Sequence, residues 1–443
     1  MEERKYWNPE IETLPRVEIE KLQEKRMKAQ VKHAYENTAY YNRKFRELGI
    51  TPEDIKTLDD FRKKVPFTIK DVVREERDKT GDPWGGFLAV PIEELVNIHT
   101  STGTTGIPTF GTYTKSDWDH IGEVVARWMW TAGLRKNEIL MNFMVYYHMY
   151  NTWLDAGAEK IGAIQFKRGG FPFEVEADVR QVKLWSYANP HVIHMLTQGL
   201  KIATAYIKEN NIDIRKMLPR LKSIIFAGDI LTSHTRKEMM DIWGVPLYDA
   251  GGPTETYCAL IGYCEENVIE NWQHMADDLC ISEVIDPERL ENIAPGERGE
   301  IVYTNLFPRR ATPYLRWRSE DAVDFEGFEC SCGRSFIKAR LLGRVAHEIR
   351  VKDKKVYQRD VEEVLQRYPE TRYVQYQTIR EKPQPQDKLI LRILKELPKE
   401  FEEKIIGDFK SQGIETVIEP LTPEEIKAAG GWKFLRIVDR KKA

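Results

Sequence analysis

Short apolar runs alternate along the chain with longer stretches of mixed polarity, and this alternation predicts the architecture. Residues 139–143, 192–196 and 224–227 are apolar runs of the length typical of buried strands. Residues 200–209 and 235–243 have the spacing of amphipathic helices. Strands and helices in alternation indicate parallel strands joined by crossover helices. We therefore expect an α/β fold built on a parallel sheet.

The two ends of the chain have different patterns. Residues 17–48 contain no proline and are rich in Glu, Lys, Gln, Ala and Arg, which favours helix, with a stop at Gly49. A strand-rich region includes residues 280–285 and 300–304. A charge-rich tail begins at residue 343, with strands expected at 349–351 and 389–394 and helices at 359–367 and 399–412. We predict a large domain over residues 1–342 and a small α+β domain over 343–443.

A run dense in glycine and hydroxyl groups follows the strand predicted at residues 95–98. Its centre comprises Ser101, Thr102, Gly103, Thr104, Thr105 and Gly106. Glycines let the backbone approach an anion closely, and successive N–H and hydroxyl groups donate hydrogen bonds to it. The run lacks the Gly-Lys-Ser/Thr end of a Walker A loop. It favours a polyphosphate site, with a flexible surface loop as the alternative.

Composition narrows the class of partner. The 443 residues include 67 Lys and Arg against 70 Asp and Glu, for a net charge of -3, which argues against nucleic acid or an anionic membrane as the partner. No apolar run approaches the roughly 20 residues of a membrane helix, and the first residues lack the apolar core of a signal peptide. Five cysteines in so long a chain do not indicate a disulfide framework. We expect a cytoplasmic protein with a small-molecule partner.

Ordered motifs along the whole chain carry a family resemblance. They are residues 6–16 (YWNPEIETLPR), 34–37 (AYEN), 66–70 (PFTIK), 252–255 (GPTE), 313–321 (PYLRWRSED), 330–334 (CSCGR) and 343–344 (GR). In this order and spacing, the chain resembles the phenylacetate-CoA ligase family of the adenylate-forming superfamily. The resemblance implies a large ATP- and carboxylate-binding domain with mixed and parallel sheets, a mobile C-terminal domain, and ATP, Mg²⁺ and CoA as ligands. It also implies a homodimer.

The resemblance assigns roles to nucleotide-site residues. Glu255 would hold Mg²⁺ at the nucleotide phosphates, which agrees with the ion's preference for one or two carboxylates beside phosphate oxygens. Asp321 would accept hydrogen bonds from the ribose hydroxyls. Other expected nucleotide contacts are Gly228, Asp229, Gly251, Gly252, Thr254, Arg334 and Arg344. The glycine and acid at 228–229 also follow a predicted strand, where ligands of parallel sheets bind. For the two arginines, a surface ion pair is the alternative.

Lys433 aligns with the lysine that would stabilise charge on the α-phosphate as pyrophosphate leaves. Three positions depart from the family pattern. The hinge reads Gly343-Arg344-Val345-Ala346-His347, where two aspartates, at 346 and 347, are usual. Glu320 stands where glycine is common before Asp321, and Gly251 replaces an aromatic residue that commonly faces adenine. The altered hinge leaves the CoA half-reaction open.

Four cysteines form a second candidate site. Thiolates of Cys258, Cys264, Cys330 and Cys332 have the composition of a tetrahedral structural zinc site. Their spacing is not that of a standard zinc finger. Buried free thiols are the alternative.

Aromatic residues at 143–153 suggest an apolar substrate pocket in which Tyr147, His148 and Ala227 take part. A core stripe is the alternative for the other aromatics. We expect an AMP-forming ligase that joins an aromatic or arylacetic acid to CoA in aromatic acid catabolism. Two alternatives remain, an adenylating enzyme that acylates an amine or a carrier protein and a catalytically silent nucleotide-binding relative.

Overall fold

The computed structural model describes residues 4–100, 108–144, 148–167, 179–256, 262–306, 310–394, 396–422, 425 and 436–441. The chain divides into two compact units. Unit 1 comprises Met1–Asp229, Met239–Ser319 and Val323–Arg340. Unit 2 comprises Ile230–Glu238, Glu320–Ala322 and Leu341–Ala443.

Unit 1 contains a five-stranded sheet in the order β4-β3-β5-β6-β7, with every pair of neighbouring strands parallel. Its strands are β3 (Ile139–Asn142), β4 (Ile164–Lys167), β5 (Val192–Leu196), β6 (Ser223–Ala227) and β7 (Leu247–Asp249). The helices between them are α7 (Met149–Ile161), α8 (Val179–Ala188), α9 (Thr197–Glu209), α10 (Ile214–Met217) and α11 (Ser233–Trp243). The predicted α/β fold with parallel strands is confirmed.

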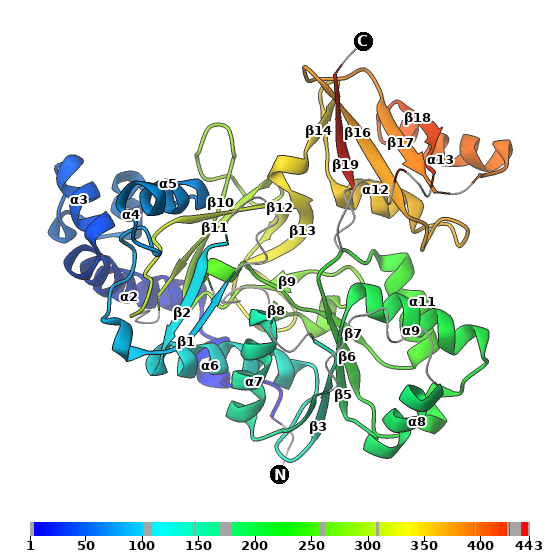
Figure 1. Ribbon diagram of the computed structural model, residues 1–443, viewed down its shortest axis with the longest axis horizontal. Coiled ribbons are helices and arrows are strands. Elements are labelled where there is room, and N and C mark those ends of the chain that lie inside the picture. Colours follow the sequence, from blue (N-terminus) through cyan, green and yellow to red (C-terminus); the bar gives the residue numbers. More distant parts are fainter. Residues whose placement is uncertain are drawn as a thin grey trace. The chain divides into compact units, whose positions relative to one another are not determined.

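Helix α6 (Lys115–Thr131) and α7 pack together on one side of this sheet, and α9 lies on the other side (Figure 1). Thr114 and Asp117 form a capping box that starts α6. A Cβ added at Gly157 in α7 would lie 2.4 Å from Val125 Cγ1 in α6. The two helices therefore approach as closely as they do because this position has no side chain.

A six-stranded sheet has the order β10-β11-β12-β13-β9-β8. Its strands are β8 (Gly262–Tyr263), β9 (Gln273–His274), β10 (Cys280–Ile285), β11 (Arg298–Asn305), β12 (Trp317–Gly327) and β13 (Lys338–Arg344). The N-terminal helices are α1 (Pro9–Glu12), α2 (Arg16–Asn37), α3 (Ala39–Glu47), α4 (Leu58–Lys64) and α5 (Lys70–Thr80). Side chains from α2 to α5 share a core with Ile281 and Trp317 of this sheet.

The helical stretch predicted at residues 17–48 is confirmed, but the structure divides it into α2 and α3 at Thr38. The Thr38 backbone is extended, its N–H still donates to Ala34 O, and its hydroxyl accepts from the Tyr41 N–H. A threonine side chain can cap a new helix as well as continue an old one. Burial of Tyr41 and Phe45 favours the new direction.

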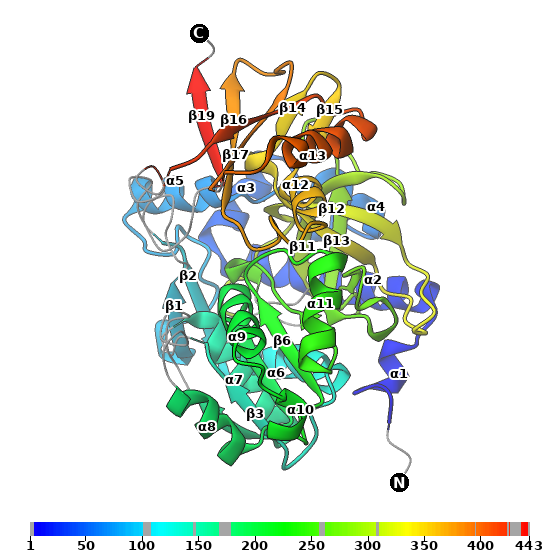
Figure 2. The same ribbon diagram turned by 90° about the vertical axis from the view of Figure 1, so that its right-hand side faces the viewer.

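Unit 2 contains a four-stranded sheet in the order β18-β17-β16-β19 (Figure 2). These strands are β16 (Tyr376–Lys382), β17 (Leu389–Ile393), β18 (Thr416–Pro420) and β19 (Ile437–Lys441). The hairpin of β14 (Ile349–Val351) and β15 (Lys354–Val356) shares an apolar core with α12 (Gln358–Leu365) and α13 (Lys399–Ser411). The expected α+β character of the C-terminal part is confirmed.

Among the described residues, none of the helices has both the length and the apolar character needed to span a bilayer.

Candidate active site

The glycine and hydroxyl run connects the two strands of a hairpin. Strands β1 (Leu95–Thr100) and β2 (Phe110–Thr114) are antiparallel, with Thr100 opposite Phe110. Residues Ser101, Thr102, Gly103, Thr104, Thr105 and Gly106 lie outside the described residues. The ends of the run are positioned by the pairing of the strands, and the His99 ring lies 3.0 Å from the Thr152 hydroxyl.

Glu255 lies beside the end of this run. It belongs to the short 3₁₀ helix Thr254–Thr256, and its residue surface is 5% exposed. The Thr109 hydroxyl donates to Glu255 Oε1 over 2.8 Å, and Lys70 Nζ lies 3.1 Å from the same oxygen. The structure thus brings together an acid predicted from sequence and two partners that sequence analysis missed. In the sequence, Lys70 ends the motif at residues 66–70, and Thr109 closes the hydroxyl-rich stretch that follows the strand predicted at 95–98.

Lys70 is positioned from its N-terminal side by strand β12. The Thr68 N–H donates to Arg316 O at 3.0 Å, and the Arg318 N–H donates to Thr68 O at 2.9 Å. Thr68 also shares a 2.7 Å hydrogen bond with the buried Tyr41 hydroxyl. These bonds fix the residues directly before α5, so Lys70 enters the site as the first residue of that helix.

Ala227, Gly228 and Asp229 lie at the carboxyl end of β6, as predicted. Gly228 has φ +102°, a conformation that favours glycine. The Thr197 hydroxyl lies 3.0 Å from Ala227 O and 3.3 Å from Asp229 O, so it holds both sides of the turn. Lys201 Nζ lies 4.0 Å from the Asp229 carboxylate.

Gly251 and Gly252 follow β7. A Cβ added at Gly251 would meet no heavy atom of the described residues within 4 Å. The Asn271 amide donates to Asp249 Oδ2 at 2.9 Å and holds the strand that leads into this turn. Position 251, where the family pattern has an aromatic residue, therefore has room for a Cβ among the described residues.

The aromatic stretch at 143–153 divides into core and cap. The buried residues Met149, Tyr150 and Trp153 belong to the core of unit 1. His148 caps α7, because its Nδ1 accepts from the Tyr150 N–H at 3.1 Å. The ring is thereby oriented at the start of the helix. Tyr147 lies outside the described residues.

In unit 2, Arg344 binds two consecutive acids. Its Nη1 donates to Asp321 Oδ1 at 2.8 Å, and its Nη2 donates to Glu320 Oε2 at 2.8 Å. Glu320 has φ +60°, a left-handed conformation that is costly for a residue with a side chain. The backbone therefore keeps the glycine-like conformation although glycine is absent.

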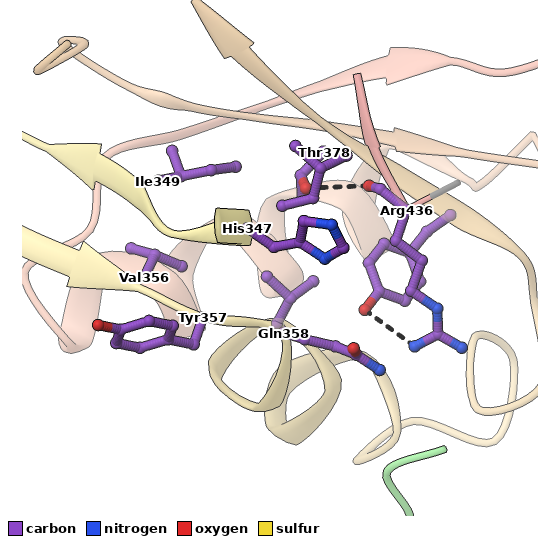
Figure 3. Close-up of a pocket in the computed structure, with 10 residues that line it drawn as sticks. His347, Ile349, Val356, Tyr357, Gln358, Thr378 and Arg436 are labelled. Carbon is purple, nitrogen blue, oxygen red and sulfur yellow. Dashed lines mark hydrogen bonds between the residues drawn. The ribbon is translucent and has the colours of Figure 1, made fainter. Parts of the chain in front are cut away.

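Lys433 lies outside the described residues, but the chain just after it is anchored in unit 2. Arg436 O accepts from the Thr378 N–H at 2.7 Å and from the Thr378 hydroxyl at 3.1 Å. The Arg436 guanidinium pairs with Glu362. His347 of the hinge lines the same recess as Arg436 (Figure 3). Burial, followed by the charge of Arg344, lowers the pKa of His347.

The predicted cysteine site contains a histidine that sequence analysis missed. The ligand atoms of Cys264, His274, Cys330 and Cys332 all lie within 4.8 Å of one another. Cys264 Sγ and Cys330 Sγ are 3.4 Å apart, and Cys332 Sγ lies 3.3 Å from His274 Nε2. Cys258 lies outside the described residues. Three thiols and one imidazole are a set that binds zinc tetrahedrally.

Hydrogen bonds surround this set. Ile337 O lies 3.3 Å from His274 Nδ1, and a carbonyl can only accept, so Nδ1 carries the proton and Nε2 faces the sulfurs. The Arg334 N–H donates to Cys332 Sγ at 3.4 Å. A hydrogen bond from Cys264 and the adjacent His274 ring lower the pKa of the Cys332 thiol, which favours the metal-binding thiolate.

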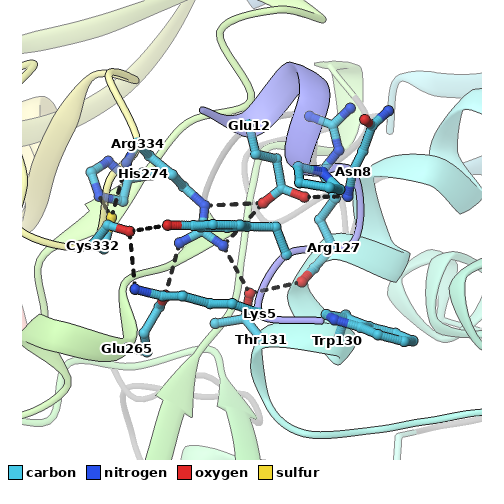
Figure 4. A network of polar contacts seen from close by, with 12 residues as sticks. Lys5, Asn8, Glu12, Arg127, Trp130, Thr131, Glu265, His274, Cys332 and Arg334 are labelled. Atoms are coloured by element: carbon cyan, nitrogen blue, oxygen red, sulfur yellow. Dashed lines mark hydrogen bonds and ion pairs between the residues drawn. The ribbon is translucent and has the colours of Figure 1, made fainter. Parts of the chain in front are cut away.

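Arg334, which was expected to contact the nucleotide, is buried among protein groups. It is 5% exposed and pairs with Glu12 at 3.0 Å and Glu265 at 2.9 Å (Figure 4). Its Nη2 also donates to the Thr131 hydroxyl at 3.3 Å. With its guanidinium occupied by protein groups, this arginine has a structural role in unit 1.

The profile of a family described as AMP-binding enzyme matches residues 22–306. This span contains both the hydroxyl-rich run and Glu255. The chain belongs to the AMP-binding enzyme family. Within this family, it is similar to the phenylacetate-coenzyme A ligase of Thermus thermophilus, with 32% identity over 82% of this chain and 79% of that one. The phenylacetate-coenzyme A ligase of Escherichia coli is 32% identical over 70% of this chain and 68% of its own.

A solved structure is similar to this chain in fold. A 2-hydroxyisobutyryl-CoA ligase in complex with its acyl-AMP superposes with a TM-score of 0.84 and 23% identity, over 99% of this chain and 93% of that chain. The resemblance to phenylacetate-CoA ligases predicted from the ordered motifs is confirmed.

Proposed function

We propose that this protein is an AMP-forming acid:CoA ligase. It converts a carboxylic acid and ATP into an acyl-adenylate and pyrophosphate, and the thiol of CoA then displaces AMP to form a thioester. Adenylation is needed because AMP is a far better leaving group than hydroxide. Membership of the AMP-binding enzymes and similarity to phenylacetate-coenzyme A ligases support both half-reactions.

The observation that carries the proposal is the buried Glu255 carboxylate at the end of the hydroxyl-rich run. Thr109 and Lys70 hold its Oε1 at 2.8 Å and 3.1 Å. A carboxylate fixed beside a phosphate-binding run is suited to hold Mg²⁺ between protein and nucleotide. Bound there, the ion would neutralise charge on the phosphates. Thr254, Gly228, Asp229, Gly251 and Gly252 complete the proposed nucleotide surface.

Two residues of unit 2 have proposed roles toward the nucleotide and the acid. Asp321 accepts hydrogen bonds from the ribose hydroxyls, and Arg344 orients its carboxylate through the 2.8 Å bond to Oδ1. Lys433 contacts the acid and the α-phosphate as pyrophosphate leaves. Arg436, three residues after Lys433, is held by Thr378 and Glu362. This supports the assignment, because it keeps the chain that follows the lysine fixed to unit 2.

The proposed order of events uses the C-terminal domain twice. The domain predicted from residue 343 presents Lys433 for adenylation and turns about the hinge to admit CoA. Ala346 and His347 replace the usual hinge aspartates, but Arg380 Nη1 donates to Ala346 O at 2.5 Å and pairs with Asp439 at 2.6 Å. This backbone contact supports a hinge that is braced without a carboxylate of its own.

We propose an aromatic or arylacetic acid as the substrate, bound near Ala227, His148 and Tyr147. His148, which caps α7, supports this choice, because its fixed imidazole is a polar group beside the aromatic core residues of that helix. We also propose zinc as a structural cofactor at Cys264, His274, Cys330 and Cys332. The enzyme would act in the cytoplasm, as a homodimer, in the breakdown of aromatic acids.

The decisive experiment measures ATP-dependent AMP release with aromatic, arylacetic and aliphatic acids, each with and without CoA. We expect AMP release to need both an aromatic acid and CoA, and Lys433→Ala to lose most of it. Lys441→Ala is the matched control, because this lysine is exposed on β19 and is expected to leave the rate unchanged.

Two other outcomes would overturn the proposal. Acid-dependent pyrophosphate exchange without CoA-dependent AMP release would favour an enzyme that acylates an amine or a carrier protein. ATP binding without turnover on any acid, unaffected by Lys433→Ala, would favour a silent nucleotide-binding relative.

A further inference from the structure

The cysteine and histidine site lies directly beneath the N-terminal strap, which we define as residues 4–14 and which includes α1. We propose that the metal bound at this site clasps the strap to unit 1, so that metal occupancy and strap docking stabilise each other. The inference rests on the proposed zinc site. It concerns a structural consequence that the ligase activity does not require.

The strap is bound to the same short turn that supplies two of the thiols. Lys5 Nζ donates to Cys332 O at 3.1 Å, and the Tyr6 hydroxyl donates to the same carbonyl. The Ser335 hydroxyl donates to Leu14 O at 2.5 Å (Figure 4 shows the neighbouring contacts). The turn at residues 330–335 therefore presents sulfur to the metal and backbone to the strap.

Arg334 contacts both a proposed metal ligand and the strap. Its N–H donates to Cys332 Sγ at 3.4 Å, while its guanidinium pairs with Glu12 of the strap at 3.0 Å. Glu12 in turn accepts from the Asn8 N–H at 2.8 Å, which closes α1 on itself. A displacement of Cys332 on loss of metal would move the carbonyl, the Arg334 backbone and, through them, α1.

Gly333 explains how the strap comes so close. It has φ +93°, and a Cβ added there would lie 2.6 Å from the Tyr6 hydroxyl oxygen. The turn therefore needs glycine both for its conformation and for contact with Tyr6. Under the proposal, the metal bonds of Cys330 and Cys332 would hold the turn in the geometry that this close fit requires.

Charge favours the same arrangement. Three thiolates and one neutral imidazole around a divalent ion carry a net charge of −1. Lys5 and Arg334 lie beside the site within a network of acids: Glu265 pairs with both, at 3.4 Å and 2.9 Å, Glu266 pairs with Lys5, and Glu12 pairs with Arg334. Groups that contact metal ligands in this way commonly change metal affinity 10- to 100-fold when they are removed.

The experiment starts with the metal itself. Zinc content of the purified full chain is measured, with one ion per chain expected, and with loss of the ion in His274→Asn and Cys332→Ser. Absence of metal from the wild type would overturn the proposed zinc site and the clasp with it, without affecting the ligase proposal.

The clasp is then tested by hydrogen exchange of residues 4–14, before and after chelation of zinc. Exchange of the amides of Ile11, Glu12 and Thr13, which are hydrogen-bonded within α1, should accelerate at least tenfold, while exchange in α13 of unit 2 stays the same. Unchanged exchange in a zinc-free chain would overturn the clasp while leaving the zinc site intact.

A reciprocal measurement avoids any general unfolding caused by chelation. The double variant Lys5→Met and Tyr6→Phe keeps all four ligands and removes both bonds to Cys332 O. Its affinity for zinc, measured at equilibrium by competition with a chelator, should be about tenfold weaker than that of the wild type, because the coupling free energy between two sites is mutual. Lys21→Met, on the exposed side of α2, is the control. Equal zinc affinities in the three proteins would contradict the clasp.

Discussion

The Thr109 hydroxyl donates a 2.8 Å hydrogen bond to Glu255 Oε1, although 146 residues separate the two in sequence. Both residues are buried, at 2% and 5% exposure. The end of the hydroxyl-rich run and the acid proposed to hold magnesium are therefore tied together. A shift of one would move the other, so the geometry of the phosphate contacts and that of the metal ligand are set jointly.

Removal of this hydrogen bond should slow adenylation. A hydrogen bond to a charged group contributes about 1.5–3 kcal/mol, so Thr109→Val should lower the rate of acid-dependent ATP–pyrophosphate exchange by about 10- to 100-fold. Thr109→Ser keeps the hydroxyl and should restore most of the rate. Equal losses in both variants would show that the methyl group, not the hydrogen bond, matters at this position.

Glu320 should destabilise the native backbone because of its φ of +60°. A residue with a Cβ pays about 1–2 kcal/mol in this conformation, which glycine avoids. Since Glu320→Gly and Glu320→Ala both remove the ion pair with Arg344, their difference isolates the backbone. We expect the glycine variant to be more stable than the alanine variant by about 1 kcal/mol in chemical unfolding. Equal stabilities would mean that the turn relaxes when the carboxylate is removed.

His194 should make the protein sensitive to acid. It is completely buried on β5, its Nδ1 lies 3.1 Å from Asn142 Oδ1, and burial lowers its pKa from 6.5 to about 3. The unfolded chain therefore takes up this proton first, and stability falls as the pH drops from about 6.5 toward 3. The slope approaches about 1.4 kcal/mol per pH unit.

Urea unfolding between pH 7 and pH 4 would measure this contribution. In His194→Leu the part of the slope due to one proton should disappear, while the Asn142 side-chain oxygen keeps the Met144 N–H as a donor at 2.9 Å. An unchanged slope in the variant would assign the acid sensitivity to other groups.

The open position at Gly251 should accept an aromatic ring. Stacking of a base on an aromatic side chain contributes about 1–3 kcal/mol, so Gly251→Tyr should lower the KM for ATP at least about fivefold. Gly251→Ala adds a Cβ where no heavy atom of the described residues lies within 4 Å and should leave the KM unchanged. A higher KM for the tyrosine variant would indicate that another side chain already covers adenine.

Local patterns were sufficient to predict much of the fold. Strands β3, β5 and β6 appeared as apolar runs because central strands of a parallel sheet are buried on both faces. The break at Thr38 was not predictable in this way, because threonine is compatible with a helix and the choice depends on what the following residues bury. The split of the N-terminal helix is thus a tertiary effect.

The candidate sites show the same division. Glu255 and the cysteines were found because their motifs are short and local. His274 was missed because it stands alone on β9, far in sequence from the Cys330–Cys332 turn that it approaches. Arg334 was assigned to the nucleotide from its motif, whereas the structure surrounds it with Glu12 and Glu265.

By itself, the sequence determined the α/β class, the glycine and hydroxyl run, the membership of an adenylate-forming family and the acid at position 255. These features can be recognised in the sequence because each depends on residues that are close together along the chain, in a short motif or in the alternation of strands and helices. Only the tertiary structure decided that Thr109 and Lys70 hold Glu255, that His274 completes the cysteine site and that residues 4–14 fasten to it. The reason is physical: hydrogen bonds, ion pairs and metal sites join atoms close in space, and packing of distant elements determines which atoms those are.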